Sequence, residues 1–511
     1  MNWKMYKALD KAAKKSEAYY IIGLDVGNDS SAIAFYNLAE GVPEAIDLSG
    51  GYGKPSVPTV MQYIPDNKEW VFGEYAVLNR GVGTIYTRLM ERMGDNDHLD
   101  VGGRSVSVAR VFSLFIKHLL ASVSSINPKA VIVGIVVAVP AYFSDKAKEE
   151  FRKVFKLAGY EKQLIALVPD RECLLTHSFP SPPEGLVNLL LLDFGSRELR
   201  GGIYQVSALN KDRNEIAAVS MSSIFDDNIS MMAINNHVKN LFRSFLPDAD
   251  KFADQIETFA YQHRDILFQK NIRTRPLKLY YNFAYPPVQH TLNFETVREL
   301  TAPYVSRFNR FIKDVLEKNL GSTGVAQVDG VLCVGGGFEM LWVREAVTAF
   351  FPKERVRFYK NPKLINAEGA ALIAAGELGF DVPKLRLEDR HRFVGDIGIL
   401  EGDRFLTLVE GSGFWWQKHP SRLVLVNRPV DGDVELGFAI RYPEGTSRVL
   451  ERIWLEGLPV RPKGTTRLEV CLSFDSNIQA RLNIRDGGFG EMFPRVDYER
   501  EFSLRLDEGD A

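Results

Sequence analysis

The chain has 511 residues, of which 45% are hydrophobic and 25% charged, as in ordinary soluble globular proteins. A single hydrophobic core stops growing at roughly 250–300 residues, so we expect more than one structural unit. The 63 basic and 65 acidic residues give a net charge of −2, which excludes the strong basic excess needed for general nucleic-acid binding.

Cysteine usage and hydropathy indicate the compartment. Cys173, Cys333 and Cys471 lie far apart without the spacing of a metal site, which is typical of free thiols in a reducing environment. No run approaches the ~20 apolar residues that span a bilayer. The basic N-terminus lacks the apolar stretch of a signal peptide. The sequence therefore predicts a cytoplasmic protein with neither nucleic acid nor membrane as its partner.

Residues 1–19 are predicted to be an N-terminal extension, with a short helix over residues 3–15. Short aliphatic runs then alternate with helix-like stretches up to about residue 380. The predicted strands read YYIIGLDV, SAIAFYN, AVIVGIVVAVP, LIALVP, VNLLLLDFG and GVLCVGGG. Their continuous apolar character is typical of strands that are covered on both faces. Strands that alternate with helices predict an α/β architecture.

The pattern of apolar and polar residues changes near residue 383. A polar, charged and proline-bearing stretch predicts a linker over residues 383–391. Residues 392–511 contain short runs such as RFLTLVE and RLEVCLSF, separated by Gly, Asp, Pro and Asn. This pattern predicts a small antiparallel β domain.

Two strands end on an acid that is followed two residues later by a glycine, namely Asp25 with Gly27 and Asp193 with Gly195. Carboxylates at strand ends suit a hydrated magnesium ion, and glycines let backbone N–H groups approach phosphate oxygens. A third candidate is the triplet Gly335–Gly337, which enters a predicted helix. Each signal alone fits a plain turn. Together, in one α/β chain, they predict phosphate binding.

With these motifs the chain resembles the actin-like ATPase superfamily, and within it the seventy-kilodalton heat-shock chaperones. The segments that carry the resemblance are IIGLDVGNDSSAIAFYN, VVAVPAYFSDKAKEEFRKVFKLAG, LLLLDFGSRELRGGIYQV, VDGVLCVGGGFEM and NPKLINAEGAALIAAGEL. They extend from about residue 20 to about residue 490 when a stretch of the β domain is included.

The resemblance implies an α/β actin-like two-lobed nucleotide-binding domain over residues 20–382, followed by a peptide-binding-like β-sandwich over residues 392–511. Lobe I is expected at about 20–205 and lobe II at about 206–345, with a return to lobe I at about 346–380. The implied cofactors are ATP or ADP with magnesium. The implied partners are an unfolded or extended polypeptide and a co-chaperone.

Site residues follow from the resemblance position by position. Asp25 and Asp193 are the expected metal-binding residues, and Asp170 stands at the place of the catalytic glutamate. Thr87 stands at the place of the hydrolytic lysine. The expected nucleotide-binding residues are Gly27, Asn28, Asp29, Gly195, Ser196, Arg197, Gly335, Gly336, Gly337 and, near the base, Arg264 with Tyr261.

The departures from the family pattern bear on hydrolysis. Asn28 and Asp29 replace two threonines, and an ionised aspartate accepts but does not donate hydrogen bonds. Ser230 and Met231 replace a glycine pair of the other lobe. Loss of one positioned donor commonly costs ~10²–10³ in rate, so we expect weak or absent hydrolysis. Arg197 or Arg200 is a candidate for the missing positive charge, and the alternative is an ordinary ion-paired arginine.

Two further departures concern coupling between the domains. The linker carries charge where the family has a run of leucines, so weak docking and weakened domain coupling are expected. The sequence also shows no segment that matches the family's helical lid.

Three functions remain open at this stage. The first is a lidless chaperone-like protein that binds ATP and an extended apolar polypeptide. The second is a nucleotide-insensitive scaffold or co-chaperone that docks a protein partner. The third, a sugar or acetate kinase, is disfavoured by the β domain and by the absence of an identifiable substrate base.

Overall fold

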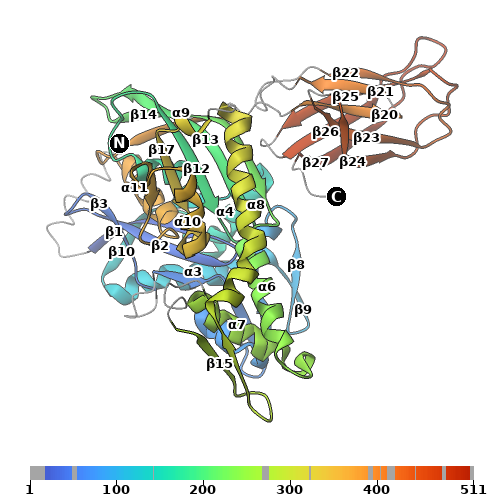
Figure 1. Cartoon of the computed structure of the whole chain (residues 1–511). Coiled ribbons are helices and arrows are strands. Elements are labelled where there is room, and N and C mark those ends of the chain that lie inside the picture. Colours follow the sequence, from blue (N-terminus) through green and yellow to red (C-terminus); the bar gives the residue numbers. More distant parts are fainter. Residues whose placement is uncertain are drawn as a thin grey trace. The chain divides into compact units, whose positions relative to one another are not determined.

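The computed structural model divides into two compact units (Figure 1). Unit 1 comprises Met1–Pro140 and Lys146–Asp389, and unit 2 comprises Ala141–Asp145 and Arg390–Ala511. The structure describes residues 18–48, 55–141, 143–267, 275–320, 324–389, 395–402, 404–410, 421–442, 445–474 and 479–506. The helix expected over residues 3–15 lies outside these ranges.

The first sheet of unit 1 has the strand order β11-β10-β1-β2-β3, and β4 pairs with β2. Its strands are β1 (Ala18–Val26), β2 (Ser30–Asn37), β3 (Val42–Ala45), β4 (Ser56–Pro58), β10 (Ala130–Val139) and β11 (Leu164–Pro169). β1, β10 and β11 are parallel, whereas β2 runs antiparallel to both β1 and β3. The predicted aliphatic strands of this region are confirmed.

The second sheet has the order β18-β17-β12-β13-β14-β19. Its strands are β12 (Val187–Phe194), β13 (Leu199–Asn210), β14 (Glu215–Asp226), β17 (Gly330–Val334), β18 (Val356–Phe358) and β19 (Lys384–Asp389). The pairs β12–β17 and β17–β18 are parallel, and β12–β13 and β13–β14 are antiparallel. Five strands of this sheet therefore repeat the order and directions of five strands of the first.

The sheet boundaries differ from the expected lobe boundaries. The second sheet begins with β12 at Val187, before the boundary expected at about residue 205, because β12 pairs with β13 and β17 rather than with the first sheet. The return to the first sheet is made by α11 (Ile365–Glu377), which contacts β1, β2 and β10. β18 still belongs to the second sheet.

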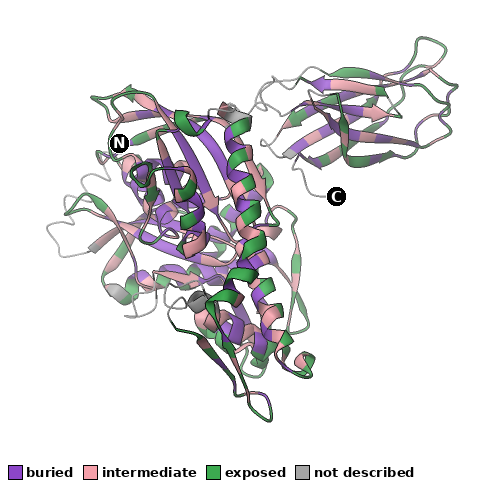
Figure 2. Cartoon of the chain, viewed as in Figure 1, coloured by how far each residue is buried: buried purple, intermediate pink, exposed green. Residues whose placement is uncertain are grey.

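Strand β12 shows why its apolar run is continuous. Leu190 and Leu192 pack into the core that contains residues of α8 and α10, whereas Leu189 and Leu191 pack on the opposite face with Ile365 of α11. Both faces of the strand are thus covered by helices. Figure 2 shows the strands of this sheet as buried, with exposed residues on the outer sides of the helices.

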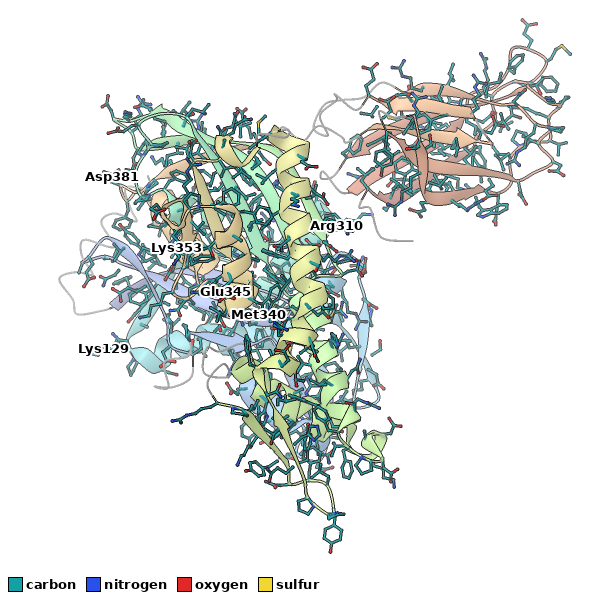
Figure 3. All side chains as sticks on the ribbon, in the orientation of Figure 1. Lys129, Arg310, Met340, Glu345, Lys353 and Asp381 are labelled. Carbon is teal, nitrogen blue, oxygen red and sulfur yellow. The ribbon has the colours of Figure 1, made fainter. Side chains whose placement is uncertain are left out.

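The helices of unit 1 include the predicted ones. They are α2 (Gly73–Leu78), α3 (Val108–Ile126), α4 (Asp145–Ala158), α5 (Asp170–Ser178), α6 (Met231–Ser244), α7 (Ala253–Leu267), α8 (Phe294–Leu320), α9 (Gly324–Gln327) and α10 (Leu341–Phe350). Arg310 on α8 and Glu345 on α10 are exposed, whereas Met340 just before α10 is buried (Figure 3). α8 and α10 therefore each turn one side to solvent.

Smaller elements complete unit 1. They are the sheet of β5 (Met61–Ile64), β6 (Glu69–Phe72) and β7 (Thr84–Tyr86), the pairs β8 (His98–Val101) with β9 (Arg104–Ser107) and β15 (Leu277–Tyr281) with β16 (Val288–Leu292), and the 3-10 turns η1 (Arg80–Val82), η2 (Leu89–Arg92), η3 (Ala249–Phe252), η6 (Gly336–Glu339) and η7 (Lys353–Arg355).

Helix α3 contains the one window in the described residues, Val108–Ser125, that is apolar and long enough to cross a membrane. In the folded chain 56% of that window is buried. Its apolar side chains are therefore explained as part of a core, which is consistent with a soluble protein.

Helix α11 is held between β1 and α5 by two close backbone approaches. A Cβ atom at Gly23 would lie 2.0 Å from the carbonyl oxygen of Ala367. A Cβ atom at Gly369 would lie 1.8 Å from the carbonyl oxygen of Cys173. Neither neighbour is a flexible side-chain end, so the helix would have to move to admit a methyl group. The two glycines thus set the position of the helix that connects the two sheets.

We expect Gly369→Ala to destabilise unit 1 by ~1–3 kcal/mol or more, because overpacking against backbone is relieved only by moving a helix. Chemical denaturation of the full chain measures this. The matched control is Gly376→Ala in the same helix, where the nearest atom is a methyl of Val382 at 3.0 Å. Since Ala favours helix by ~1 kcal/mol over Gly, this control should be neutral to stabilising. Equal stabilities of the two variants would contradict the packing argument.

Strand β19 corrects the expectation for the linker. Lys384–Asp389 pairs in parallel with β14, from Glu215↔Lys384 to Ser220↔Asp389. Leu385 and Leu387 pack against the core cluster that contains Ile216 and Ala218. Residues 384–389 of the predicted linker thus belong to the second sheet, because an edge strand needs only alternate apolar side chains and the backbone pairing adds the rest. The weakened coupling between the domains stays a prediction.

Unit 2 is built from two four-stranded antiparallel sheets with the orders β21-β20-β23-β24 and β22-β25-β26-β27. Its strands are β20 (Asp396–Glu401), β21 (Arg404–Val409), β22 (Arg422–Val426), β23 (Val434–Arg441), β24 (Ser447–Leu455), β25 (Thr466–Phe474), β26 (Gln479–Asp486) and β27 (Glu499–Arg505). Both sheets contribute to one core. The predicted antiparallel β domain is confirmed.

Candidate functional site

Three carboxylates from the two large sheets of unit 1 act on one another electrostatically. Asp25 lies near the end of β1, Asp170 begins α5 directly after β11, and Asp193 lies near the end of β12. Burial, followed by the charges of Asp170 and Asp193, raises the pKa of Asp25 to about 8. Burial, followed by the charge of Asp170, raises the pKa of Asp193 to about 7. The structure thus brings these three predicted residues into one acidic cluster.

Two cationic side chains adjoin the acidic cluster. Lys363 lowers the pKa of Asp25, although less than burial and the other acids raise it. Arg200 donates from Nε to Glu198 at 3.0 Å. Burial by itself lowers the pKa of Arg200, but the carboxylates of Glu198, Asp170 and Asp193 raise it above its ordinary value. Thr87 replaces the lysine expected from the family, and Arg200 supplies a positive charge near the cluster instead. Its guanidinium group is paired with Glu198.

Amide side chains add neutral oxygen atoms. Asn366 of α11 donates a hydrogen bond to the carboxylate of Asp25. Its own Oδ1 is buried and has no hydrogen-bond partner among the described residues. The same holds for Oδ1 of Asn28, whose Nδ2 donates to Oε1 of Glu91 at 3.2 Å. Buried acceptors of this kind normally face a donor or an ion.

The oxygen-rich donor set fits a hydrated divalent cation. Magnesium prefers oxygen ligands and keeps several of its waters. Among the described residues, no group of three or more His, Cys, Asp or Glu side chains is arranged to hold a metal ion directly. Asp25, Asp193 and Asp170 are the residues that could hold such an ion through its waters.

The two acid–glycine turns are built alike. Gly27 N–H donates to the carbonyl of Ser30 at 3.2 Å, and Gly195 N–H donates to the carbonyl of Glu198 at 3.0 Å. Each turn closes an antiparallel hairpin, β1–β2 or β12–β13. The N–H groups of the two glycines are consequently engaged within their own turns.

The second turn also accepts hydrogen bonds from backbone N–H groups at the start of α6. Met231 N–H donates to the carbonyl of Gly195 at 3.1 Å, and Met232 N–H donates to the carbonyl of Ser196 at 2.9 Å. Ser230 is buried and caps the helix by accepting from Ala233 N–H at 3.1 Å. The first three N–H groups of α6 are thus occupied. A helix start that binds phosphate needs such groups free, so this part of the second loop does not fit a phosphate.

The glycine triplet is explained largely by packing. Gly335 has φ +84, and a Cβ atom there would lie 2.6 Å from Oδ1 of Asp193. At Gly337 a Cβ atom would lie 2.2 Å from the ring of Phe194. At Gly336 it would lie 3.5 Å from Nζ of Lys363. The triplet therefore positions β17 against the second turn and places a lysine ammonium group over Gly336.

The remaining predicted residues are distributed as follows. Thr87 is exposed, between β7 and η2. Its neighbour Arg88 forms an ion pair with Glu91 at 2.7 Å, and Glu91 accepts from Asn28 of the first turn. Arg197 is half-buried in the second turn. Arg264 belongs to α7, but its side chain lies outside the described residues.

Asp29 and Tyr261 line one cavity of about 140 Å³. The cavity lies between the first turn, α2 with η1, and the helices α6 and α7. The first turn and the helix expected near the base thus share a ligand-sized space.

Sequence reasoning missed Lys363, Asn366 and Glu91. Lys363 and Asn366 precede or begin α11 within the segment NPKLINAEG, which carries part of the family resemblance. Their spacing of three residues at the start of a helix could have indicated that both side chains lie on the same side of it. Glu91 lies in a short 3-10 turn and gave no signal.

Two families match parts of the chain. Residues 42–251 match a family of unknown function, DUF5716, C-terminal. Residues 401–506 match a domain of unknown function, DUF8552, which covers most of unit 2. The second match supports the separation of unit 2 as a domain, and neither description names an activity.

Proposed function

We propose that unit 1 is an actin-like two-lobed unit that binds a magnesium-bound adenine nucleotide with little or no hydrolysis. The observation that carries this proposal is the acidic cluster of Asp25, Asp170 and Asp193, contributed by two sheets with the same strand order. Carboxylates that raise one another's pKa resist ionisation unless a cation accompanies them. A ligand that carries its own divalent ion meets that requirement.

Different residues of unit 1 would bind the ion and the anionic part of the ligand. Asp25 and Asp193 would hold the waters of the ion, and Asn366 would keep the Asp25 carboxylate in place through its hydrogen bond. Lys363, whose Nζ lies near Gly336, would face the anionic part of the ligand. The bound magnesium ion would supply the positive charge that neutralises carboxylates and phosphate.

Hydrolysis is disfavoured by three features of the same region. Thr87 is exposed and carries no charge. Asp170 is one methylene shorter than the expected glutamate, which alters the reach of a general base. The first N–H groups of α6 are engaged with the second turn, so they do not stabilise charge on a transferring phosphate.

Unit 2 is proposed to bind an extended apolar polypeptide segment, in the cytoplasm. Support comes from β22, an edge strand whose Leu423 is 56% exposed, because an edge strand offers backbone hydrogen-bonding groups to an added strand. The cytoplasmic assignment is supported by the three cysteines, all of which are free thiols.

A nucleotide-insensitive scaffold or co-chaperone is the second candidate. It is favoured by the start of α6, where the backbone N–H groups that would bind phosphate already have hydrogen-bond partners. In that case the acidic cluster binds a cation alone and stabilises the fold.

Thermal unfolding with magnesium-ATP distinguishes the two candidates. A ligand at about 100 times its Kd stabilises by ~2.7 kcal/mol, so a clear rise of Tm is expected at millimolar ATP. Asp193→Asn should abolish the rise. The matched control Asp248→Asn, in an exposed ion pair with Lys251, should retain it. No rise in the wild-type protein would overturn the first candidate and favour the second.

A phosphate-release assay tests the absence of turnover. We expect no release above background from the wild-type chain, and Thr87→Lys should not exceed a small fraction of an ordinary chaperone's rate, since the N–H groups at the start of α6 stay hydrogen-bonded. Release at an ordinary chaperone's rate by the wild-type chain would show that hydrolysis is intact.

A further inference from the structure

The two large sheets of unit 1 place a different residue beside each strand-end acid. Asp25 on β1 lies directly opposite Ala32 on β2, and Asp193 on β12 lies directly opposite Arg200 on β13. The spacing along the chain is the same in both hairpins, from 25 to 32 and from 193 to 200. Directly opposite residues of an antiparallel pair share one face of the sheet, with Cβ atoms about 4.5–5.5 Å apart. Equivalent positions therefore carry a methyl group beside one acid and an arginine side chain beside the other.

Arg200 lies on the face of the second sheet that carries the acidic cluster. Leu189, Leu191 and Tyr204 on that face pack in one core cluster with the start of α11. Asp193 continues the alternation of Leu189 and Leu191 along β12. Arg200 continues the alternation of Tyr204 along β13. The side chains of Asp193 and Arg200 are thus neighbours on the side of the sheet that α11 covers.

The equivalent position beside Asp25 is used for helix packing. Ala32 is buried and packs against Ala367 and Ala371 of α11. A longer side chain at this position would displace the helix. The positive charge that acts on Asp25 comes instead from Lys363, which precedes α11. Of the two positions opposite the acids, the one beside Asp193 carries the cation.

The guanidinium group of Arg200 is held in place by the second turn. Its Nε donates to the carboxylate of Glu198 at 3.0 Å, and the two side chains are 24% and 16% exposed. A charge-assisted hydrogen bond between partly buried groups favours one orientation. Burial and then Asp170 raise the pKa of Asp193, and the charge of Arg200 opposes that rise. Arg200 therefore already acts as a counter-ion of Asp193.

A fixed guanidinium group weakens the binding of a divalent cation in two ways. It offsets part of the negative charge that would attract the ion, and it repels the ion's two positive charges. Both effects are stronger in a partly buried site than in water. A magnesium ion that is bound to a polyanion is repelled less, because the anion brings negative charge to the arginine.

We infer that Arg200 is a specificity-determining residue, a tethered counter-ion that competes with magnesium for the acidic cluster and keeps the affinity for the free ion low. Combined with the proposed function, on which this step rests, magnesium would enter the site as its complex with the nucleotide rather than as the free ion. The competition itself needs no nucleotide, so it can be measured without one.

The test is a titration of the full chain with magnesium chloride at neutral pH without nucleotide, followed by thermal unfolding and by calorimetry. Arg200→Met removes the charge and should lower the Kd for magnesium about 10-fold, a typical size for coupling between two sites. Arg200→Lys keeps the charge and should bind magnesium as weakly as the wild-type chain. The matched control is Arg386→Met, on an exposed position of β19 in the same sheet, which should leave the Kd unchanged.

If Arg200→Met fails to fold, Arg200→Gln carries the test with the same expected direction, because it keeps a donor for Glu198. Equal Kd values for the wild-type chain and the neutral variant overturn the inference. The same fall in Kd in Arg386→Met also overturns it, because the effect would then come from net charge alone. A wild-type chain that ignores magnesium-ATP, while the neutral variant still binds magnesium more tightly, overturns the proposed nucleotide function and supports the role of Arg200.

Discussion

In EDTA, the free energy of unfolding of unit 1 is expected to fall as the pH rises from about 4 to about 8. Burial raises the pKa of Asp25 to about 8 and that of Asp193 to about 7, from an ordinary value of 3.8. Between these values the folded chain binds more protons than the unfolded chain, so the stability these groups contribute is present at low pH and is lost as pH rises. One pKa unit corresponds to ~1.4 kcal/mol, so the two shifts together set an upper limit on the order of 10 kcal/mol, which the coupling between the two carboxylates reduces.

Magnesium should flatten this decline, because a bound cation favours the ionised carboxylates. Urea denaturation at a series of pH values, with EDTA and with magnesium, measures both curves. Asp193→Asn removes one member of the coupled pair and should reduce the slope by about half in EDTA. The control Asp248→Asn, in the exposed pair with Lys251, should leave the slope unchanged. A wild-type curve that rises with pH over this range would contradict the cluster.

The strands and their acids were readable from sequence because they depend on local pattern. The apolar run before Asp193 predicts a buried strand, and its position at the strand end predicts a carboxylate at the sheet edge. The pairing of this acid with Asp25 and Asp170 depends on the packing of the two sheets. The matched acid–glycine turns suggested that Asp25 and Asp193 act together, but only the family resemblance pointed to Asp170.

The hydrogen bonds that close the two acid–glycine turns were not readable from sequence. The residues of the second turn allow either free or engaged backbone N–H groups. The outcome is set by the start of α6, where Met231 and Met232 donate to the turn's carbonyls. Such contacts between backbone groups more than thirty positions apart leave no mark in side-chain chemistry.

The roles of Lys363 and Asn366 were also not predictable from the sequence, because they depend on how α11 packs. They act on Asp25, more than 300 positions earlier in the chain, because α11 packs on β1 at Gly23. The glycine is visible in the sequence, but the helix that needs its missing side chain is not. The roles of these two residues therefore emerge only when the helix is in place.

Arg461→Met is expected to destabilise unit 2 by ~3–5 kcal/mol, because it leaves a buried carboxylate without its counter-charge. The guanidinium group donates to both carboxylate oxygens of Asp486, at 2.7 and 2.8 Å, and to the carbonyl of Pro494 at 2.8 Å. The two side chains are 3% and 0% exposed. Asp486 also accepts from the N–H groups of Gly488 and Val496. The pair thus fixes the segment between β26 and β27.

Amide hydrogen exchange of β25 and β26 in the full chain resolves the stability of unit 2 and measures this effect. The matched control is Arg485→Met in the same sheet, whose ion pair with Glu499 is about half exposed and should therefore contribute little to stability. Arg461→Met combined with Asp486→Leu should recover part of the loss, because no charge is then buried alone. If Arg461→Met cost no more than Arg485→Met, the buried pair would not hold this segment in place.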